Sequence, residues 1–237
     1  MTEPPFLTYD SRTAMVEALA ERIAGVLREA VARRARAGLI VSGGSTPKPL
    51  FERLSKMDLA WPQVSITLAD ERRVSPEHDA SNARLVRDHL LQDRAQDAAF
   101  IPLVEDGGSP EDDAASARAR LDGFPWPADI TLLGMGPDGH TASWFPGASQ
   151  LAAVLEPEGE RRCLALTPDP LPIEAPYPRV TLTLPAILAS RQILVMLSGA
   201  EKRAAYRRAA AGGAIEERPI RAVLRQRRVP LELHWAP

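Results

Sequence analysis

Residues 132–147 read LLGMGPDGHTASWFPG, an apolar run that stops abruptly in a glycine-rich loop. Three glycines of this loop precede His140. Glycine lets backbone N–H groups approach a ligand closely, and histidine titrates near neutral pH. In open parallel sheets, ligands bind at the carboxyl ends of strands. The segment therefore predicts a buried strand whose carboxyl end carries a ligand site with a titratable side chain.

The same segment also fits G-x-G-x-x-G, the pattern of dinucleotide-binding loops, from Gly134 to Gly139. That pattern requires a long helix directly behind the third glycine, whereas here Pro146 and Gly147 leave room for only a short one. The acidic residues about 20 positions further on lie beside a proline and a glycine, which does not suit the pattern. We therefore expect no nicotinamide and no other cofactor.

Composition and charge exclude several classes of protein. The chain has 237 residues, an apolar fraction of 45% and a formal net charge of −2, which gives no electrostatic case for binding nucleic acid or an anionic membrane. Cys163 is the single cysteine, so no internal disulfide forms, and its apolar neighbours favour a place in the core. Without a signal pattern or a membrane-length apolar run, we expect a cytoplasmic protein; its oligomeric state stays open.

Strand-like and helix-like segments alternate along the chain. Asp10 or Ser11 caps a first predicted helix that continues to about position 37, where Gly38 ends it. Further helices are predicted at 47–57, with Thr46 as the cap, and at 81–91, 109–123, 200–211 and 219–227. Strands are predicted at 39–41, 64–69, 99–104, 129–133, 163–166, 179–184, 192–197 and, at an edge, 231–235. The alternation predicts a single α/β domain over 1–237, with a mainly parallel sheet and helices on both faces.

A second strand end carries the sequence SGGSTP at 42–47. Backbone N–H groups at a helix start, together with hydroxyl groups, predict an anion site formed by Ser42, Gly43, Gly44, Ser45 and Thr46. The spacing fits neither a Walker A loop nor a nucleophile elbow. A plain tight turn is the alternative.

Two more strand ends add charged residues. Asp70 and Arg72 lie in the run DERR at 70–73, which could equally be a surface salt-bridge cluster. The run SGAEK at 198–202 brings Lys202 to a helix start beside the anion site, and Arg179 begins a strand behind a proline-rich loop. The remaining histidines, at positions 78, 89 and 234, are interpreted as structural or solvated. No clustered metal-ligand pattern is present in the sequence, so we expect no metal.

Taken together, these residues resemble the 6-phosphogluconolactonases, members of a superfamily that includes the glucosamine-6-phosphate isomerase/deaminases. The matching segments are SGGSTP (42–47), DER with a downstream SN (70–72, 81–82), GMGPDGHTASWFPG (134–147), RVTLTLPAIL (179–188) and SGAEK (198–202). The resemblance implies a modified Rossmann-like domain that hydrolyses 6-phospho-D-glucono-1,5-lactone to 6-phosphogluconate without a metal. It also implies that His140 is the catalytic histidine, that 42–46 is the phosphate loop, and that Lys202 and Arg179 lie near phosphate or carboxylate.

On this reading, His140 deprotonates a water aimed at lactone C1, and Asp138 or Asp70 orients the imidazole. Either the backbone N–H groups of a glycine loop or an arginine such as Arg72 stabilises the oxyanion. One rival is an aminosugar isomerase, whose family has a glutamate five residues after the histidine where this chain has Phe145. The other is a sugar-phosphate-sensing regulatory domain, which requires a DNA-binding segment that the first 38 residues, with one predicted helix, do not provide.

Overall fold

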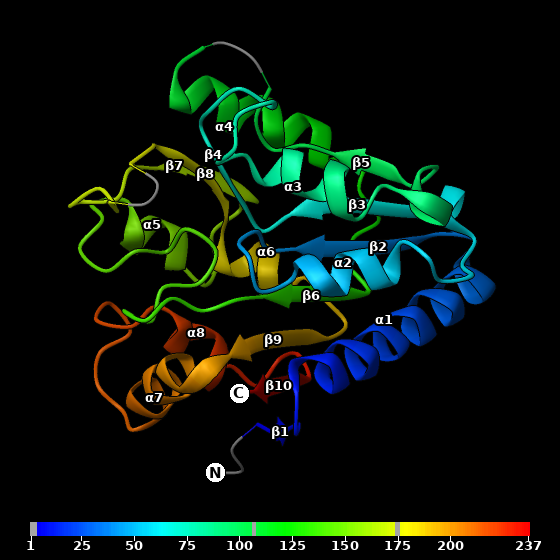
Figure 1. Ribbon diagram of the computed structural model, residues 1–237. Coiled ribbons are helices and arrows are strands. Elements are labelled where there is room, and N and C mark those ends of the chain that lie inside the picture. Colours follow the sequence, from blue (N-terminus) through cyan, green and yellow to red (C-terminus); the bar gives the residue numbers. More distant parts are fainter. Residues whose placement is uncertain (1–3, 106–107, 174–175) are drawn as a thin grey trace.

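The computed structural model describes residues 4–105, 108–173 and 176–237, and its main sheet consists of seven parallel strands (Figure 1). In spatial order these are β1 (Phe6–Thr8), β10 (Leu231–Ala236), β9 (Ile193–Ser198), β6 (Ile130–Leu133), β2 (Ala37–Val41), β3 (Val64–Leu68) and β5 (Ala99–Ile101). Every residue of the central strands β2 and β6 is buried, as expected for a sheet covered on both faces.

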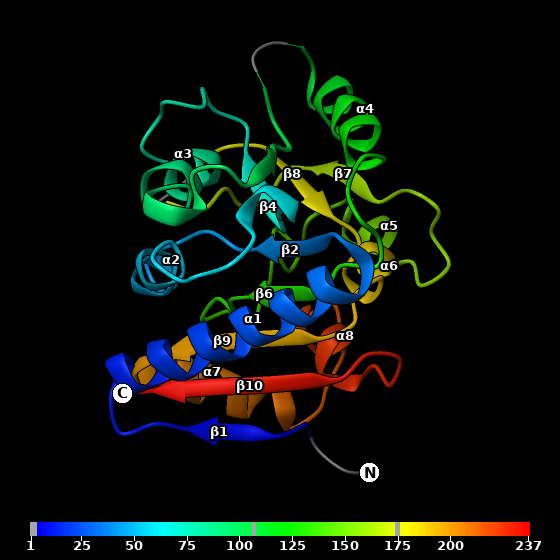
Figure 2. The same cartoon turned by 90° about the vertical axis from the view of Figure 1, so that its right-hand side faces the viewer.

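The helices follow the strands along the chain and cover both faces of the sheet. Figure 2 shows α1 crossing one face, with α7 and α8 on the opposite side. The helices are α1 (Arg12–Arg34), α2 (Lys48–Leu54), α3 (Asn82–His89), α4 (Pro110–Leu121), α5 (Leu151–Leu155), α6 (Leu184–Leu188), α7 (Gly199–Ala210) and α8 (Ile220–Arg225), with 3-10 turns η1 (Trp61–Gln63) and η2 (Asp93–Ala95). The predicted fold class, a mainly parallel sheet with helices on both faces, is confirmed.

Helix α1 begins where predicted and ends earlier. The Ser11 side chain accepts a hydrogen bond from the backbone N–H of Ala14 at 3.1 Å, which makes Ser11 the N-cap. The helix ends at Ala35, whose φ of 57° is left-handed, so the prediction that Gly38 stops it is wrong. Gly38 lies within β2, where an added Cβ would be 2.9 Å from the Phe124 ring. Close packing between strand and ring explains this glycine.

A second, smaller sheet was not predicted. In it β4 (Asp70–Arg72), β8 (Arg179–Leu182) and β7 (Cys163–Leu166) pair antiparallel. Two strands assigned to the mainly parallel arrangement, at 163–166 and 179–184, belong here, and the second ends at Leu182 because α6 starts two residues later. This sheet lies beside the carboxyl ends of the main strands (Figure 1). It brings Arg72, at the end of β4, beside Arg179, at the start of β8.

Three predicted boundaries also require correction. Strand β5 ends at Ile101 rather than at 104, because Pro102 has no N–H to continue the ladder. Pro47 occupies the N-cap of α2 without a side-chain cap, so Thr46 is not the cap, and the helix ends at Leu54 rather than at 57. Strand β10 is not an edge strand, because β1 pairs with its outer side. The helices α5 and α6 were not predicted.

Candidate active site

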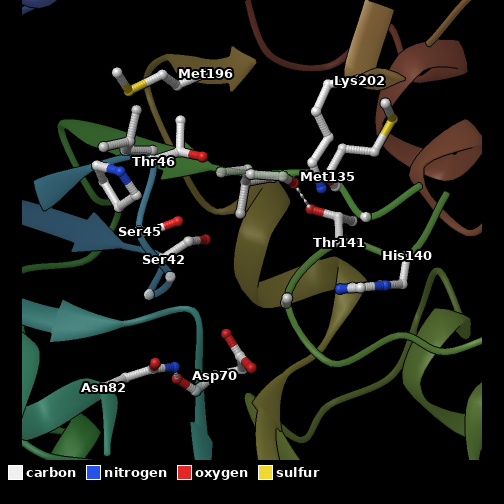
Figure 3. Close-up of a pocket in the computed structure, with 18 of the residues that line it drawn as sticks. Ser42, Ser45, Thr46, Asp70, Asn82, Met135, His140, Thr141, Met196 and Lys202 are labelled. Atoms are coloured by element: carbon white, nitrogen blue, oxygen red, sulfur yellow. Dashed lines mark hydrogen bonds between the residues drawn. The ribbon is translucent and has the colours of Figure 1, made fainter. Parts of the chain in front are cut away.

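A cavity of about 510 Å³ opens at the carboxyl ends of β2, β6 and β9, bounded by the start of β4 (Figure 3). Parallel strands end at the same edge of a sheet, so the loops that follow them meet there. All of the predicted site residues except one line this cavity: Ser42, Gly43, Gly44, Ser45, Thr46, Asp70, Arg72, His140, Arg179 and Lys202. The exception, Asp138, contacts the cavity through His140.

The loop after β6 holds His140 at the cavity wall. The backbone N–H of Gly136 donates to the carbonyl of His140 at 2.8 Å, which closes the loop on itself. Gly139 has a φ of 88°, and its carbonyl accepts from the N–H of Ile220 at 2.9 Å, which ties the loop to α8. The glycines thus permit a tight turn that a side chain at either position would obstruct.

His140 and Asp138 form a hydrogen-bonded pair. Nδ1 of His140 lies 2.6 Å from Oδ1 of Asp138, and the His140 backbone N–H also donates to that oxygen at 3.1 Å. Burial acts to raise the pKa of the Asp138 carboxyl, but the bonds to His140 outweigh it and the pKa lies below its ordinary value. An ionised carboxylate requires the proton on Nδ1, so the neutral imidazole presents its lone pair at Nε2.

Nε2 of His140 has no hydrogen-bond partner among the described residues. The imidazole points toward the middle of the cavity in Figure 3. A ring held at one nitrogen by a carboxylate, with the other nitrogen open, has the arrangement of a general base.

Asp70 is buried on the opposite side of the cavity and has a different partner. Its Oδ2 accepts a hydrogen bond from the Ser143 hydroxyl at 2.5 Å. Burial lowers the pKa of the Arg179 guanidinium to about 10 while the nearby charge of Asp70 acts to raise it, so Arg179 stays protonated at neutral pH. The hydrogen bonds therefore assign the orientation of the imidazole to Asp138, and they place Asp70 with Ser143.

The loop after β2 is a tight turn with open polar atoms. Gly44 has a φ of 93°, which favours glycine. At Gly43, an added Cβ would lie 1.8 Å from Oδ1 of Asn82, whose Nδ2 donates to the carbonyl of Asp70 at 2.8 Å. Asn82 is buried and thus fixes the distance between the loop and the start of β4. Ser42 Oγ and Ser198 Oγ, buried in the cavity wall, have no hydrogen-bond partner among the described residues.

Lys202 comes from the first turn of α7. Its ammonium group donates to the carbonyl of Met135, in the loop that carries His140 (Figure 3). The helix begins at Gly199, whose φ of 86° allows the sharp turn out of β9. A cation, a helix start and the hydroxyl-rich loop at 42–46 therefore line the same cavity, and such groups together favour binding of an anion.

Comparisons with known proteins agree with this geometry. Residues 10–235 match the sequence profile of the glucosamine-6-phosphate isomerases/6-phosphogluconolactonase family. A 6-phosphogluconolactonase of Rhizobium meliloti is 41% identical over 229 residues, with 97% of each chain covered. The crystal structure of a 6-phosphogluconolactonase from Shewanella baltica has a TM-score of 0.94 at 45% identity, covering 100% of this chain and 99% of that chain. This chain belongs to the glucosamine-6-phosphate isomerase/6-phosphogluconolactonase family.

Another relative of the same family, a 6-phosphogluconolactonase of Mesorhizobium japonicum, is 44% identical over 229 residues, which is 97% of this chain and 94% of that protein. A solved monomeric glucosamine-6-phosphate deaminase is 20% identical with a TM-score of 0.79, and that likeness concerns the fold alone. The fold alone therefore does not distinguish between the two activities in the family's description.

Two site residues of this family member, Asn82 and Ser143, are not among the predicted ones. Asn82 follows the helix cap Ser81. Asparagine is mostly exposed in proteins, so the sequence gives only a weak indication that Asn82 is buried at the site. Ser143 lies three residues after His140 in a loop whose path only the tertiary structure shows. Neither contact, to Gly43 or to Asp70, can be inferred from spacing.

The other singled-out side chains lie away from the cavity. Cys163 is buried, with its thiol 3.4 Å from the carbonyl of Ala114, and burial raises its pKa to about 11, so it is an inert core residue. His89 pairs with Glu52 at 2.9 Å, and His234 is buried in β10. In the ranges 4–105, 108–173 and 176–237, no group of three or more His, Cys, Asp or Glu residues is placed to hold a metal ion. No helix of these ranges is long and apolar enough to cross a membrane.

Proposed function

We propose that this protein hydrolyses 6-phospho-D-glucono-1,5-lactone to 6-phosphogluconate. The observation that carries the proposal is the His140–Asp138 pair, whose open Nε2 faces a cavity that is also lined by the hydroxyl-rich loop at 42–46 and by Lys202. Membership of the family, and the names of its relatives at 41% and 44% identity, support this substrate class. A base at one place and an anion site at another suit a substrate with a reactive ester and a remote phosphate.

The chemistry assigned to His140 is general base catalysis. Nε2 accepts a proton from water as the water oxygen bonds to lactone C1. In the tetrahedral intermediate, the negative charge rests on the former carbonyl oxygen. The C1–ring oxygen bond then breaks, the imidazolium returns its proton to the leaving ring oxygen, and Asp138 balances the imidazolium charge meanwhile.

The positive groups of the cavity are assigned to the two anionic parts of the substrate. Arg72 lies at the end of β4, with Nη1 bound to the carbonyl of Ala80 at 2.6 Å, and we assign it to the oxyanion. Lys202 and the loop at 42–46 are assigned to the phosphate, and Arg179 adds positive charge to the same cavity. Binding of the remote phosphate positions C1 against the base.

The test is hydrolysis of the phosphorylated lactone, corrected for spontaneous opening, by wild type and by His140→Ala. General base catalysis contributes roughly 10²–10⁴-fold, so a loss of that size in kcat is expected. The matched control is His89→Ala, which removes a histidine outside the cavity and is expected to keep wild-type turnover. Wild-type turnover by a folded His140→Ala protein would exclude this histidine as the base.

The rival activity, isomerisation with deamination of glucosamine 6-phosphate, is tested in the same preparation. Proton shuttling between C1 and C2 needs a second titratable group, and Phe145 has no exchangeable proton at the position where the resembling isomerases have a glutamate. We expect no release of ammonia or fructose 6-phosphate at high enzyme concentration. Turnover of this substrate comparable with lactone hydrolysis would assign the protein to the other branch.

A further inference from the structure

Phe145 contacts two of the charged or titratable groups of the cavity. Its ring centroid lies 4.4 Å from that of His140, with an interplanar angle of 31°. The guanidinium carbon of Arg179 lies over the same ring, 5.6 Å from its centroid. Phe145 is half-buried and lines the cavity.

The hydrogen bond to Asp138 constrains the imidazole at one nitrogen. The ring turns by rotation about the Cα–Cβ and Cβ–Cγ bonds, and a bond at Nδ1 limits these rotations without contacting either face of the ring. A residual rotation would move Nε2 within the cavity. The Phe145 ring, tilted by 31° at a centroid distance of 4.4 Å, restricts this rotation, because turning the imidazole further would lose the ring contact or produce a clash.

The backbone of Gly136 packs against the same imidazole. A Cβ added there would lie 2.1 Å from Nδ1 and 2.2 Å from Cε1 of His140, so the loop backbone is already close to that edge of the ring. Asp138, Gly136 and Phe145 thus constrain the position, one edge and the plane of the imidazole. Nε2 is the ring nitrogen that remains open.

Arg179 is held independently of Phe145. It is buried, its Nε donates to the carbonyl of Tyr177 at 3.1 Å, and the charge of Asp70 acts on it. The cation over the ring therefore helps to fix Phe145, whose face is attracted to a guanidinium within about 6 Å. The chain of contacts runs from an anchored cation, through the aromatic ring, to the base.

We propose that Phe145 is a positioning residue that fixes the plane of the His140 imidazole and so aims Nε2 at the reacting carbon. This inference rests on the proposed lactone hydrolysis for its kinetic consequence. It assigns Phe145 a positive function, in addition to the lack of an exchangeable proton that argues against the isomerase reaction. An aliphatic side chain of similar volume would fill the space without setting a ring plane.

The test compares the kinetics of Phe145→Leu, which removes the aromatic ring, with those of Phe145→Tyr, which keeps it. Small misplacements of a catalytic group are costly, so we expect kcat to fall roughly ten- to a hundredfold in the leucine variant, with KM changed much less. The tyrosine variant is expected to recover most of kcat. Phe100→Leu is the matched control, because Phe100 also lies under an arginine, Arg87 at 5.5 Å, but outside the cavity.

Proton chemical shifts test the contact between the Phe145 and His140 rings without measuring turnover. Ring currents of Phe145 shift the carbon-bound imidazole protons of His140, and the signals are assigned by comparison with His140→Ala. We expect this shift to be lost in Phe145→Leu and kept in Phe145→Tyr and Phe100→Leu. An unchanged shift in Phe145→Leu, an unchanged kcat, or a kcat that tyrosine does not restore would overturn the proposal. If wild type does not open the lactone, the proposed function fails, and the proton signals still decide whether the Phe145 ring lies against the imidazole.

Discussion

At Gly136, an added Cβ atom would lie 2.1 Å from Nδ1 of His140 and 2.5 Å from Oδ1 of Asp138. Real Cβ atoms do not come this close to other heavy atoms, so any side chain there must displace the histidine, the aspartate or the loop. The absence of a side chain at Gly136 is therefore as important for the position of the His140 imidazole as the hydrogen bond to Asp138. The opposite wall has a similar pair, in which Gly43 makes room for Asn82.

We expect Gly136→Ala to lower kcat by roughly a hundredfold, because a displacement of about 1 Å at a reacting group has that effect. The measurement is background-corrected lactone hydrolysis with saturating substrate. Gly25→Ala is the control, because Gly25 lies on α1 with nothing within 4 Å of an added Cβ. Equal kcat in the two variants would show that the loop adjusts at no catalytic cost.

The elements differ in how much of their stability is local. Helix α1 has a local cap at Ser11 and a buried stripe of apolar residues at helical spacing, comprising Met15, Leu19, Ile23 and Leu27. Strand β1 has three residues and depends on the outer side of β10. Long elements with caps are therefore visible in sequence, whereas short edge strands are not.

Within α1, Gly25 is exposed and in a helical conformation, so alanine there loses no contact. Glycine in a helix interior is less favourable than alanine by roughly 0.5–1 kcal/mol. We expect Gly25→Ala to raise the free energy of unfolding by about that amount, measured by urea denaturation. Gly44→Ala is the contrast, since a φ of 93° strains alanine, and it is expected to lower this free energy. A destabilised Gly25→Ala protein would contradict the local argument.

Strand β10 contains a buried titratable group. His234 is buried, its Nδ1 lies 2.8 Å from the Tyr9 hydroxyl, and Glu232 and Arg22 are its charged neighbours. Burial lowers the pKa of His234, although Glu232 acts in the opposite direction. The unfolded chain therefore binds a proton more readily than the folded one, so the stability is present above the unfolded pKa and is lost as pH falls below it.

We expect the free energy of unfolding to decrease as pH is lowered from about 8 to 5, and His234→Phe to remove part of this decrease. Urea denaturation at several pH values measures both slopes. His89→Ala is the matched control, because His89 is not buried and pairs with Glu52. The same slope in wild type and His234→Phe would show that other groups control the pH dependence.

On the scale of the whole molecule, the cavity is a product of parallel strand alignment. Loops from Ser42 to Lys202 meet there because β2, β6 and β9 end at one edge, and the small antiparallel sheet adds Asp70, Arg72 and Arg179. Positive side chains and hydroxyls therefore converge on the cavity that also contains the hydrogen-bonded His140–Asp138 pair. This division suits substrate anchoring at one end and chemistry at the other.

Because the donor groups of the described residues do not form a metal site, we expect lactone hydrolysis to survive exhaustive chelation. The measurement is background-corrected turnover before and after dialysis against a strong chelator. The control is the same dialysis with added Mg²⁺ or Zn²⁺, which is expected to leave turnover unchanged. Loss of activity that one divalent ion restores would overturn the metal-independent chemistry.

Features that depend on neighbouring residues in the chain were predictable from the amino-acid sequence. His140 and Asp138 are two residues apart, and the glycines around them carry a clear signal, so this pair was predictable as a site. The alternation of strands and helices predicted the fold class, and the strand ends predicted which loops meet, because parallel strands share one edge.

Contacts between residues that are far apart in the chain are visible only in the folded molecule. The Ser143–Asp70 contact joins positions separated by 73 residues, whereas the imidazole bonds to Asp138, its neighbour two positions away. Position 38 of β2 requires glycine because the Phe124 ring packs against it. The ring of Phe145 lies against that of His140 because the loop after β6 turns back. Such contacts depend on how separate elements pack, and the chemistry of a short segment does not specify its partner across the fold.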